Sequence, residues 1–152
     1  MICVIQRVNK ATVYADGVLS GEIGKGLYLL LGVAGGDTSE DVLVLAEKIS
    51  KLRIFTDSLD KMNLSVNDIS GEVMVVSNFT LNANYKKGNR PDYLNSAPPA
   101  VADTLYEEFK VEMAKRVKKV ASGRFGADMK TEMETDGPVT IVMDSAVLLK
   151  KG

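Results

Sequence analysis

The sequence predicts a mixed α/β domain in which a curled, barrel-like β-sheet carries two main helices on one side. Segments with the apolar or alternating pattern of strands dominate the chain, two longer segments have a helical apolar period, and turn residues separate these segments. The length of 152 residues favours one domain over residues 1–152, large enough to bury a core of its own.

Strands are predicted at the start of the chain. Residues 1–8, "MICVIQRV", are typical of a first strand. Residues 11–23 predict a hairpin, because Asp16-Gly17 provides the positive φ angles of a type I′ turn. The apolar run "LYLLLGV" at residues 27–33 favours a strand that is buried on both faces.

Two segments are predicted to be helices. The first is expected to begin after a cap at Asp37 or Thr38, with acidic residues in its first turn. Its apolar face comprises Val42, Leu45, Ala46, Ile49 and Leu52. The second helix is expected to run from about Ala100 to Lys119. Its apolar face comprises Val101, Leu105, Phe109, Met113 and Val117.

Further strands are expected between and after the helices. A short strand is expected at residues 53–55, and "EVMVVSNFTL" at residues 72–81 predicts a longer one. Residues 125–135 alternate between apolar and polar side chains, and residues 139–144 are apolar and β-branched. A strand pair is therefore expected on the two sides of Gly137-Pro138, the two residues least suited to a strand interior.

The composition excludes several kinds of site. The chain has no histidine, which removes the usual general base at neutral pH, the histidine-containing triads and the common zinc ligand sets. No metal ion or cofactor is therefore expected. The net charge of −1 provides no global attraction for nucleic acid. The single cysteine, Cys3, cannot form an internal disulfide and is expected to be a small buried hydrophobe, as in a reducing cytosol.

The sequence also lacks the patterns of secretion and membrane insertion. No signal peptide is recognisable at the N-terminus, and the longest apolar stretch is too short to span a bilayer. A cytoplasmic protein without membrane contact is expected.

The segment "SNFTL", residues 77–81, is the first candidate for a functional site. It lies at the predicted end of a strand, where side chains are held rigidly and still reach solvent. Ser77 and Thr80 offer hydroxyl groups, and Asn78 offers an amide. The alternative is an ordinary strand end with Phe79 and Leu81 in the core.

The dipeptide Gly137-Pro138 is the second candidate. Its simplest interpretation is a turn or bulge between two strands. Because glycine has no Cβ and an X-Pro bond has a cis option, the dipeptide could instead present backbone oxygens to a ligand.

Two basic clusters are the third candidate. One lies in the polar loop at residues 82–99 and comprises Lys86, Lys87 and Arg90, with Tyr85 and Tyr93 nearby. The other follows the second helix and comprises Lys115, Arg116, Lys118, Lys119 and Arg124. The usual explanation of each cluster is a solvated surface. The alternative is that the cations contact phosphates while the tyrosines stack on bases.

The order and spacing of many short motifs make the chain similar to the D-aminoacyl-tRNA deacylase family. The motifs are "VIQRV", "GEIGKGL", "LGV" followed by "GDT", "AEKI", "LRIF", "KMNLS", "VVSNFTL", "KKGNRPD", "SAPP", "GRFGADM" and "DGPVT". The resemblance covers nearly the whole length, which makes it far more specific than any one motif.

The resemblance implies an enzyme that hydrolyses the ester between a D-amino acid, or misplaced glycine, and the terminal adenosine of tRNA. It implies a homodimer with a cross-subunit active site and a cis Gly137-Pro138 bond that projects toward the partner's pocket. The implied catalytic segment comprises Ser77, Asn78, Phe79 and Thr80. The implied selection residues are Gly137 and Pro138, supported by Arg7, Phe125 and Met129. Apart from the resemblance, the charge of Lys86, Lys87 and Arg90 makes these residues candidates for a weaker contact to tRNA.

Two positions depart from the usual family motifs. Asn78 stands where glutamine is usual, and Thr135 stands where asparagine is usual. If backbone groups act at these positions, both exchanges should be tolerated. If the glutamine amide contacts substrate, Asn78 would loosen that contact.

The expected mechanism uses few side chains. Backbone N–H groups near Phe79 and Thr80 could stabilise an oxyanion, and water would attack with help from the ribose 2′-OH. Thr80 as a nucleophile is the alternative, although no base is evident beside it in the sequence. Two other functions stay open at this point: an editing deacylase with a different substrate, and a non-catalytic RNA-binding module.

Overall fold

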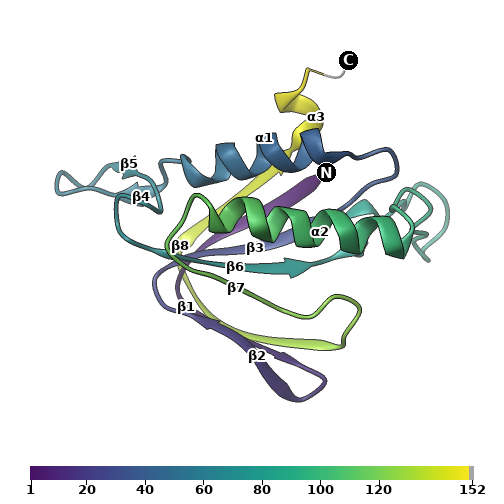
Figure 1. Cartoon of the computed structure of the whole chain (residues 1–152), viewed down its shortest axis with the longest axis horizontal. Helices are drawn as coiled ribbons and strands as arrows, with labels where there is room; N and C mark the ends of the chain where they lie inside the picture. The colour runs from purple at the N-terminus through teal and green to yellow at the C-terminus, as the bar shows by residue number, and fades with distance from the viewer. Residues whose placement is uncertain (151–152) are drawn as a thin grey trace.

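The computed structural model describes residues 1–150, and residues 151 and 152 of the predicted domain lie outside the described part. In chain order the elements are β1 (Ile2–Ala15), β2 (Val18–Ile23), β3 (Gly26–Gly32), α1 (Ser39–Ser50), β4 (Phe55–Thr56), β5 (Met62–Leu64), β6 (Glu72–Ser77), the 3₁₀ helix η1 (Phe79–Asn82), α2 (Pro99–Ala114), β7 (Val120–Ser122), β8 (Met129–Asp144) and α3 (Ser145–Leu148). Helices α1 and α2 pack against each other over one face of the sheet (Figure 1).

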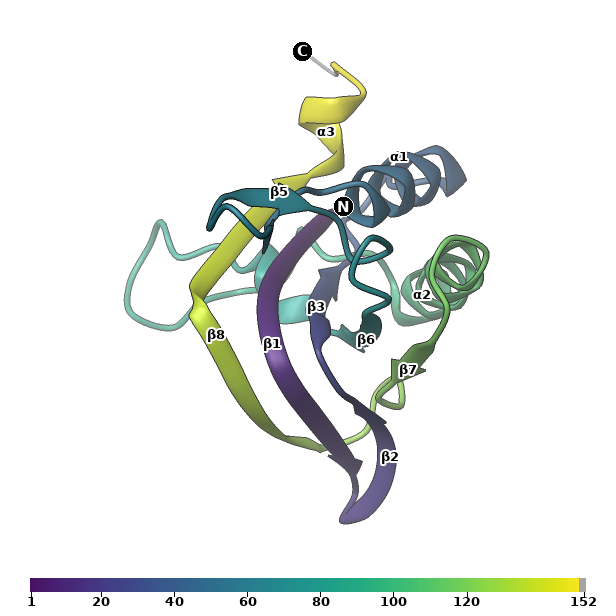
Figure 2. The ribbon, with the colours of Figure 1, turned by 90° about the vertical axis from the view of Figure 1, so that its left-hand side faces the viewer.

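The main sheet is strongly curled, as the sequence predicts. Its strand order is β2-β1-β3-β6-β7, and β8 pairs with β1. The far end of the path returns to its beginning, because the Ser20 hydroxyl on β2 donates a hydrogen bond of 2.8 Å to the Ser122 carbonyl on β7. Figure 2 shows the sheet wrapping around toward closure. The predicted class, a mixed α/β fold with a barrel-like sheet and two main helices, is confirmed.

Two separate clusters of buried side chains stabilise this arrangement. The larger one lies between the sheet and the helices and includes Phe55, Phe109 and Met113. The smaller one lies within the curl of the sheet and includes Ile23, Tyr28 and Met74. Burial of such large apolar side chains is the main favourable contribution to folding.

The predicted hairpin and first helix are confirmed. Asp16 and Gly17 have φ angles of 49° and 80°, as the type I′ turn requires. Thr38 caps α1, and the Asp41 side chain accepts from the Thr38 N–H, completing a capping box. The buried apolar residues of α1 are Val42, Leu45, Ala46 and Ile49.

The predicted second helix is wrong at its C-terminal end. Helix α2 begins with Pro99 and ends at Ala114, well before Lys119. Its core-facing stripe also differs at the start, because Val101 is 46% exposed while Ala102 is buried. The residues after the helix turn and form β7, a strand parallel to β6 that is not predicted from the sequence. A three-residue strand is too short to show a period of its own.

Two strands end differently from their prediction. Strand β6 stops at Ser77 instead of Leu81, because the chain turns directly into η1. The predicted short strand at residues 53–55 is instead β4, at Phe55–Thr56. The segment after Ser77 still follows the end of a strand, as expected, and Phe79 is 58% exposed, not part of the core.

The expected pair of strands around Gly137-Pro138 is in fact one long strand with a bulge. Both halves of β8 pair with β1 on the same side. Gln6 pairs with Thr140 and Val8 pairs with Thr135, so β8 places residues 136–139 opposite Arg7 alone. Extra residues in one strand bend it and interrupt its ladder, and Figure 2 shows this sharp bend in β8. The bulge interpretation of the dipeptide is therefore correct.

Candidate active site

An apolar pocket of about 570 Å³ lies where β3 and β6 end and α2 begins. It is lined by Leu31, Val33, Ser77, Asn78, Phe79, Tyr93, Leu94, Ser96, Ala97, Pro98, Pro99, Ala102, Tyr106, Phe125 and Gly126. Strand ends and a helix start supply polar backbone groups, and the surrounding side chains are mostly apolar. No carboxylate, lysine or arginine is among the lining residues of this pocket.

The turn after β6 supplies the polar end of the pocket. The Asn78 N–H donates a hydrogen bond of 2.8 Å to the Leu31 carbonyl on β3, which fixes the start of the turn. A Cβ atom on Gly32 would lie only 2.9 Å from the Cβ of Leu81, so glycine allows η1 to pack closely on the end of β3.

The Asn78 side chain caps η1 from within the same turn. Its Oδ1 accepts a hydrogen bond of 3.2 Å from the Thr80 N–H, and it also accepts from the Thr80 hydroxyl. Because both donors come from Thr80, the amide orientation is fixed with Oδ1 toward that residue. The Asn78 Nδ2 group then has no acceptor within residues 1–150, which leaves it available to a ligand.

Two aromatic rings form one rim of the pocket. The rings of Phe79 and Tyr93 meet edge to face, with centroids 5.0 Å apart. The Ser96 hydroxyl donates to the Phe79 carbonyl at 3.2 Å, which ties the returning chain to η1. The rim is therefore held by contacts on both of its sides.

Tyr106 of α2 lies at the buried side of the pocket. Its hydroxyl donates to the carbonyls of Val75 and Gly123, at 3.1 and 3.4 Å, between the ends of β6 and β7. Burial raises its pKa to about 12, so the phenol stays protonated at neutral pH and cannot serve as a base. Its ring lies 6.0 Å from the ring of Phe125, centroid to centroid, and Lys110 Nζ lies over the Tyr106 ring at 4.8 Å from its centroid.

The buried side chain of Arg7 holds the bulge in β8 from the protein interior. The Arg7 Nε donates to the Asp136 carbonyl at 3.1 Å and lies 3.2 Å from an Asp136 carboxylate oxygen. Its NH1 group donates to the Ile54 carbonyl at 2.8 Å. Arg7 is buried, whereas Gly137 and Pro138 are exposed, and the peptide bond between them is cis. Arg7 therefore fixes an exposed stretch of main chain from the protein interior.

Gly137 is the residue at which the bulge admits no side chain. Its φ angle is +134°, and a Cβ atom there would lie 2.7 Å from the Val139 nitrogen. Only glycine adopts this backbone conformation without strain.

The structure brings together some of the predicted site residues and separates others. Ser77, Asn78, Phe79 and Phe125 line the pocket. Thr80 contacts it through Asn78. Gly137, Pro138 and Arg7 lie outside the pocket of their own chain. Met129 is also outside it, because it pairs with Ala15 at the far end of β1 and packs in the smaller core cluster.

Several residues of the pocket wall carry no recognisable signal in the sequence, above all Tyr106, Leu94 and Ala102. Tyr106 precedes Phe109 by one helical turn on the apolar face of α2, so its spacing signals a core residue and nothing more. The Pro98-Pro99 pair is evident in the sequence, but proline is common at the start of a helix, so the pair does not indicate a pocket.

Residues 1–150 contain no group of three or more histidine, cysteine, aspartate or glutamate side chains that could hold a metal ion. None of their helices is long and apolar enough to cross a membrane.

The fold and the pocket define a small α/β protein with a mostly apolar site whose polar groups are amide, hydroxyl and main-chain groups. Comparison with known proteins gives the family: a family model described as D-Tyr-tRNA(Tyr) deacylase matches residues 4–144, and the chain belongs to this family.

Relatives with similar sequences cover almost the entire chain. A D-aminoacyl-tRNA deacylase of Akkermansia muciniphila is 53% identical over 146 residues, which are 95% of this chain and 97% of the relative. One of Persephonella marina is 53% identical over 148 residues, which are 97% of this chain and 100% of the relative.

Solved structures share the fold. A structure described as a c-Myc DNA unwinding element binding protein has a TM-score of 0.88 and 37% identity, and covers 95% of this chain and 98% of its own. A probable eukaryotic D-amino acid tRNA deacylase, at a TM-score of 0.78 and 15% identity, covers 93% of this chain and 97% of its own, and shows the common fold alone.

Proposed function

We propose that the protein hydrolyses the ester bond of D-aminoacyl-tRNA and so releases the D-amino acid from tRNA. The observation that carries the proposal is the uncharged pocket at the end of β6, whose polar groups include those of the Ser77–Phe79 segment. An aminoacyl ester is reactive already, so it needs positioning and a stabilised oxyanion more than a strong base. The family to which the chain belongs supports the same substrate.

We propose that water is the nucleophile and that the ribose 2′-OH of the substrate helps to position it. The Phe79 N–H, which has no acceptor among the described residues, and the Asn78 Nδ2 group would stabilise the oxyanion. The Thr80 N–H contributes less than the sequence suggested, because it already donates to Asn78. The Thr80 hydroxyl donates its proton to the same oxygen, and no basic side chain of residues 1–150 contacts it.

Selection against L-amino acids is assigned in this proposal to Gly137 and Pro138 of a second protomer. Within one chain the bulge lies outside the pocket, although it is exposed and firmly held by Arg7. The outer edge of β8 pairs with no other strand of residues 1–150, and Val142 on this strand is 69% exposed. A homodimer formed along this side would place main-chain carbonyls of the bulge in the partner's pocket, where an L side chain would clash.

Such a site would reject L side chains instead of recognising any particular D side chain. Broad tolerance of D-amino acids and activity on glycyl-tRNA are therefore expected. Because aminoacyl-tRNA is the substrate, we place the protein in the cytoplasm.

Deacylation assays with D-tyrosyl-tRNA, glycyl-tRNA and L-tyrosyl-tRNA test the proposed function. We expect rapid release from the first two and little release from the third. Preferential release of the L-amino acid would identify an editing enzyme with a different substrate. Absence of release from all three, with RNA binding intact, would identify a binding module.

Mixed dimers test the cross-subunit site. Ser77→Tyr fills the pocket, and Gly137→Ala disrupts the bulge, so each homodimer should be inactive. Random mixing should restore about a quarter of the wild-type activity, since half of the dimers combine one intact pocket with one intact bulge. No recovery on mixing, despite exchange of subunits shown by mass spectrometry, would place both parts of the site in one chain.

A further inference from the structure

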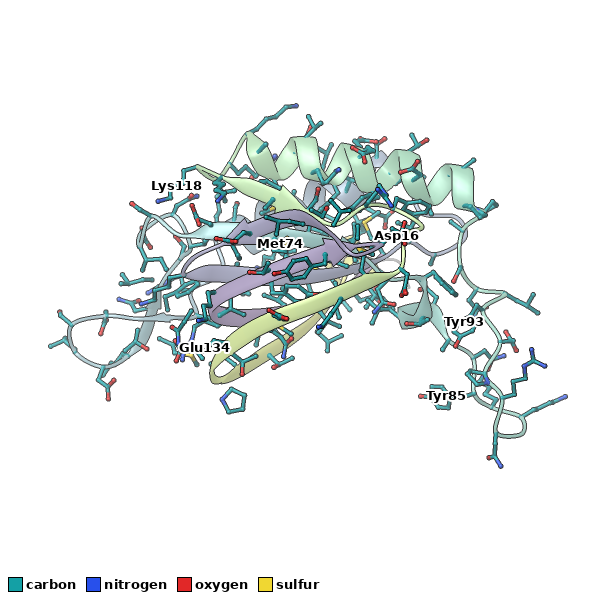
Figure 3. All side chains as sticks on the ribbon, turned by 90° about the horizontal axis from the view of Figure 1, so that it is seen from below. Asp16, Met74, Tyr85, Tyr93, Lys118 and Glu134 are labelled. Carbon is teal, nitrogen blue, oxygen red and sulfur yellow. The ribbon has the colours of Figure 1, made fainter. Side chains whose placement is uncertain are left out.

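The loop between Asn84 and Asp92, called here the basic loop, has a rigid base. The N–H of each of these two residues donates to the carbonyl of the other, at 2.8 and 3.0 Å. The Asn84 side chain also donates to the Asp92 carboxylate at 3.2 Å, and the Lys86 N–H donates back to Asn84 Oδ1. Although it projects from the body of the protein, the basic loop thus leaves in a defined direction (Figure 3).

The tip of the basic loop is cationic and aromatic. It carries Lys86, Lys87 and Arg90, all exposed, and Tyr85 is 81% exposed. None of the three cations forms an ion pair with a residue of the described chain. Their charge is therefore fully available to a partner.

The second basic cluster differs in this respect. Lys115 and Arg116 both pair with Glu112, each at 2.7 Å. Lys119 lies 3.8 Å from Glu72, and Arg124 pairs with Asp16. Of this cluster only Lys118 has no such partner within residues 1–150, and Figure 3 shows it at the opposite end of the molecule from Tyr85. A cluster neutralised by its own carboxylates attracts phosphate only weakly.

The basic loop lies directly beside the pocket. Tyr93 and Leu94, which line the pocket, follow its closing residue Asp92 in the chain. On its other side the loop begins just after η1, which supplies Phe79 to the rim. A polymer whose last nucleotide occupied the pocket would therefore leave it along the basic loop.

We infer that the basic loop binds the single-stranded 3′ end of tRNA, with Lys86, Lys87 and Arg90 on phosphates and Tyr85 stacked on a base. The identity of the RNA rests on the proposed function. Cations arranged with an exposed aromatic ring are the usual means of holding unpaired nucleotides, because every base offers a face for stacking. A protein partner fits less well, since lysine is depleted from protein interfaces.

A comparison of two substrates tests this role. The variant Lys86→Gln/Lys87→Gln/Arg90→Gln is assayed on D-tyrosyl-tRNA and on the D-tyrosyl ester of adenosine alone. We expect kcat/KM to fall at least about 10-fold on tRNA and less than about 2-fold on the nucleoside ester, which lacks the phosphates. Equal loss on both substrates would show that the loop shapes the pocket, and no loss on either would exclude RNA contact.

The matched control removes the same charge from the paired cluster, as Lys115→Gln/Lys119→Gln/Arg124→Gln. We expect this control variant to change kcat/KM by no more than about 2-fold on either substrate, because the replaced cations are already neutralised by carboxylates. A loss on tRNA equal to that of the loop variant would overturn the assignment to the loop.

Salt gives a second readout. Three phosphate contacts to a single strand predict that wild-type kcat/KM on tRNA falls roughly 20-fold more between 50 and 200 mM salt than that of the loop variant. Identical salt dependence would contradict the proposal.

Direct binding separates this inference from the proposed function. If the wild-type protein hydrolyses neither D-tyrosyl ester, the proposed function fails, and RNA binding is measured by fluorescence anisotropy. An RNA hairpin ending in single-stranded CCA should bind the wild type at least about 10-fold more tightly than the loop variant. Binding that is unchanged in the variant, or equally tight for a blunt-ended hairpin, would overturn the inference.

Discussion

The pocket at the end of β6 is a hollow with apolar walls, whereas the bulge in β8 is a projection made largely of main chain. The pocket draws its lining from several elements, and the short turn after β6 supplies Ser77 and Asn78 among its polar groups. The bulge depends on one buried side chain, Arg7, and on the absence of a side chain at Gly137. The pocket has the shape to receive a ligand, and the bulge has the shape to project into a pocket. The two regions do not meet within one chain.

This difference gives the two regions different sensitivities to substitution. A pocket wall shared among many residues should tolerate the loss of one contact. A bulge held by one glycine and one arginine should not. Four substitutions test this contrast.

Gly137→Ala should have the largest effect. A Cβ atom has no room at φ +134°, so residues 136–139 must shift, and a displacement of about 1 Å in a positioning group can cost 10²-fold in rate. We expect kcat/KM on D-tyrosyl-tRNA to fall by about that factor, which leaves the homodimer nearly inactive. Gly17→Ala is the control, because it also places alanine at positive φ, and its activity should be unchanged. Equal activity of both variants would contradict a role for the bulge.

Arg7→Met should come next. It removes the hydrogen bonds to Asp136 and Ile54, and bonds to a charged donor contribute roughly 1.5–3 kcal/mol each when buried. We expect a clearly lower melting temperature by calorimetry and about a 10-fold loss of kcat/KM as the bulge loosens. Lys10 lies on the same strand as Arg7 and forms an exposed ion pair with Glu134 of β8. Lys10→Met removes this pair and should change neither the melting temperature nor kcat/KM.

Thr80→Ala tests the pocket side. If the Thr80 hydroxyl only completes the cap on Asn78, its loss removes one hydrogen bond of about 1 kcal/mol, and kcat should fall no more than about 5-fold. Thr80→Ser should be indistinguishable from the wild type. Complete loss of turnover with an intact dimer would instead make Thr80 the nucleophile.

Tyr106→Phe should have the smallest effect. The Val75 carbonyl that its hydroxyl contacts also accepts from the Gly123 N–H at 3.2 Å, so the loss in the free energy of unfolding should be about 1 kcal/mol, with kcat unchanged. The pKa of Tyr106 is raised by burial from 10.0 to about 12, so the folded state keeps this proton after the unfolded state has lost it. Above about pH 10 the wild type should therefore lose stability relative to the variant, and between pH 6 and 9 the difference should be constant. Denaturation with urea at each pH measures both.

The sequence predicts local structure well where one short signal decides it. Asp16-Gly17 specifies its turn through φ alone, and Thr38 caps α1 through its own hydroxyl. Prediction from the sequence fails where pairing between distant segments decides the structure. Nothing local ends α2 at Ala114 or makes a strand of residues 120–122, because β7 exists only through its pairing with β6.

The candidate site shows the same division. Family motifs indicate Ser77, Asn78 and Phe79, and the structure places all three on one pocket. The remaining wall is formed by residues such as Tyr106 and Leu94 from segments that only the tertiary fold brings together. Met129 belongs to the same motif as Phe125, but the pairing of β8 with β1 places it against the smaller core cluster, away from the pocket.

The cap formed by Asn78 bears on the exchange of glutamine for asparagine. Asparagine is a favoured residue for this contact, because its short side chain can reach the N–H two residues ahead, and glutamine is one methylene longer. In this chain the amide oxygen of Asn78 is therefore engaged in the cap, and only its Nδ2 group has no partner among the described residues. If glutamine stands here in other members, as the resemblance implies, both atoms of its amide would be free to meet a substrate, and two branches of one family would differ in catalytic detail at this position.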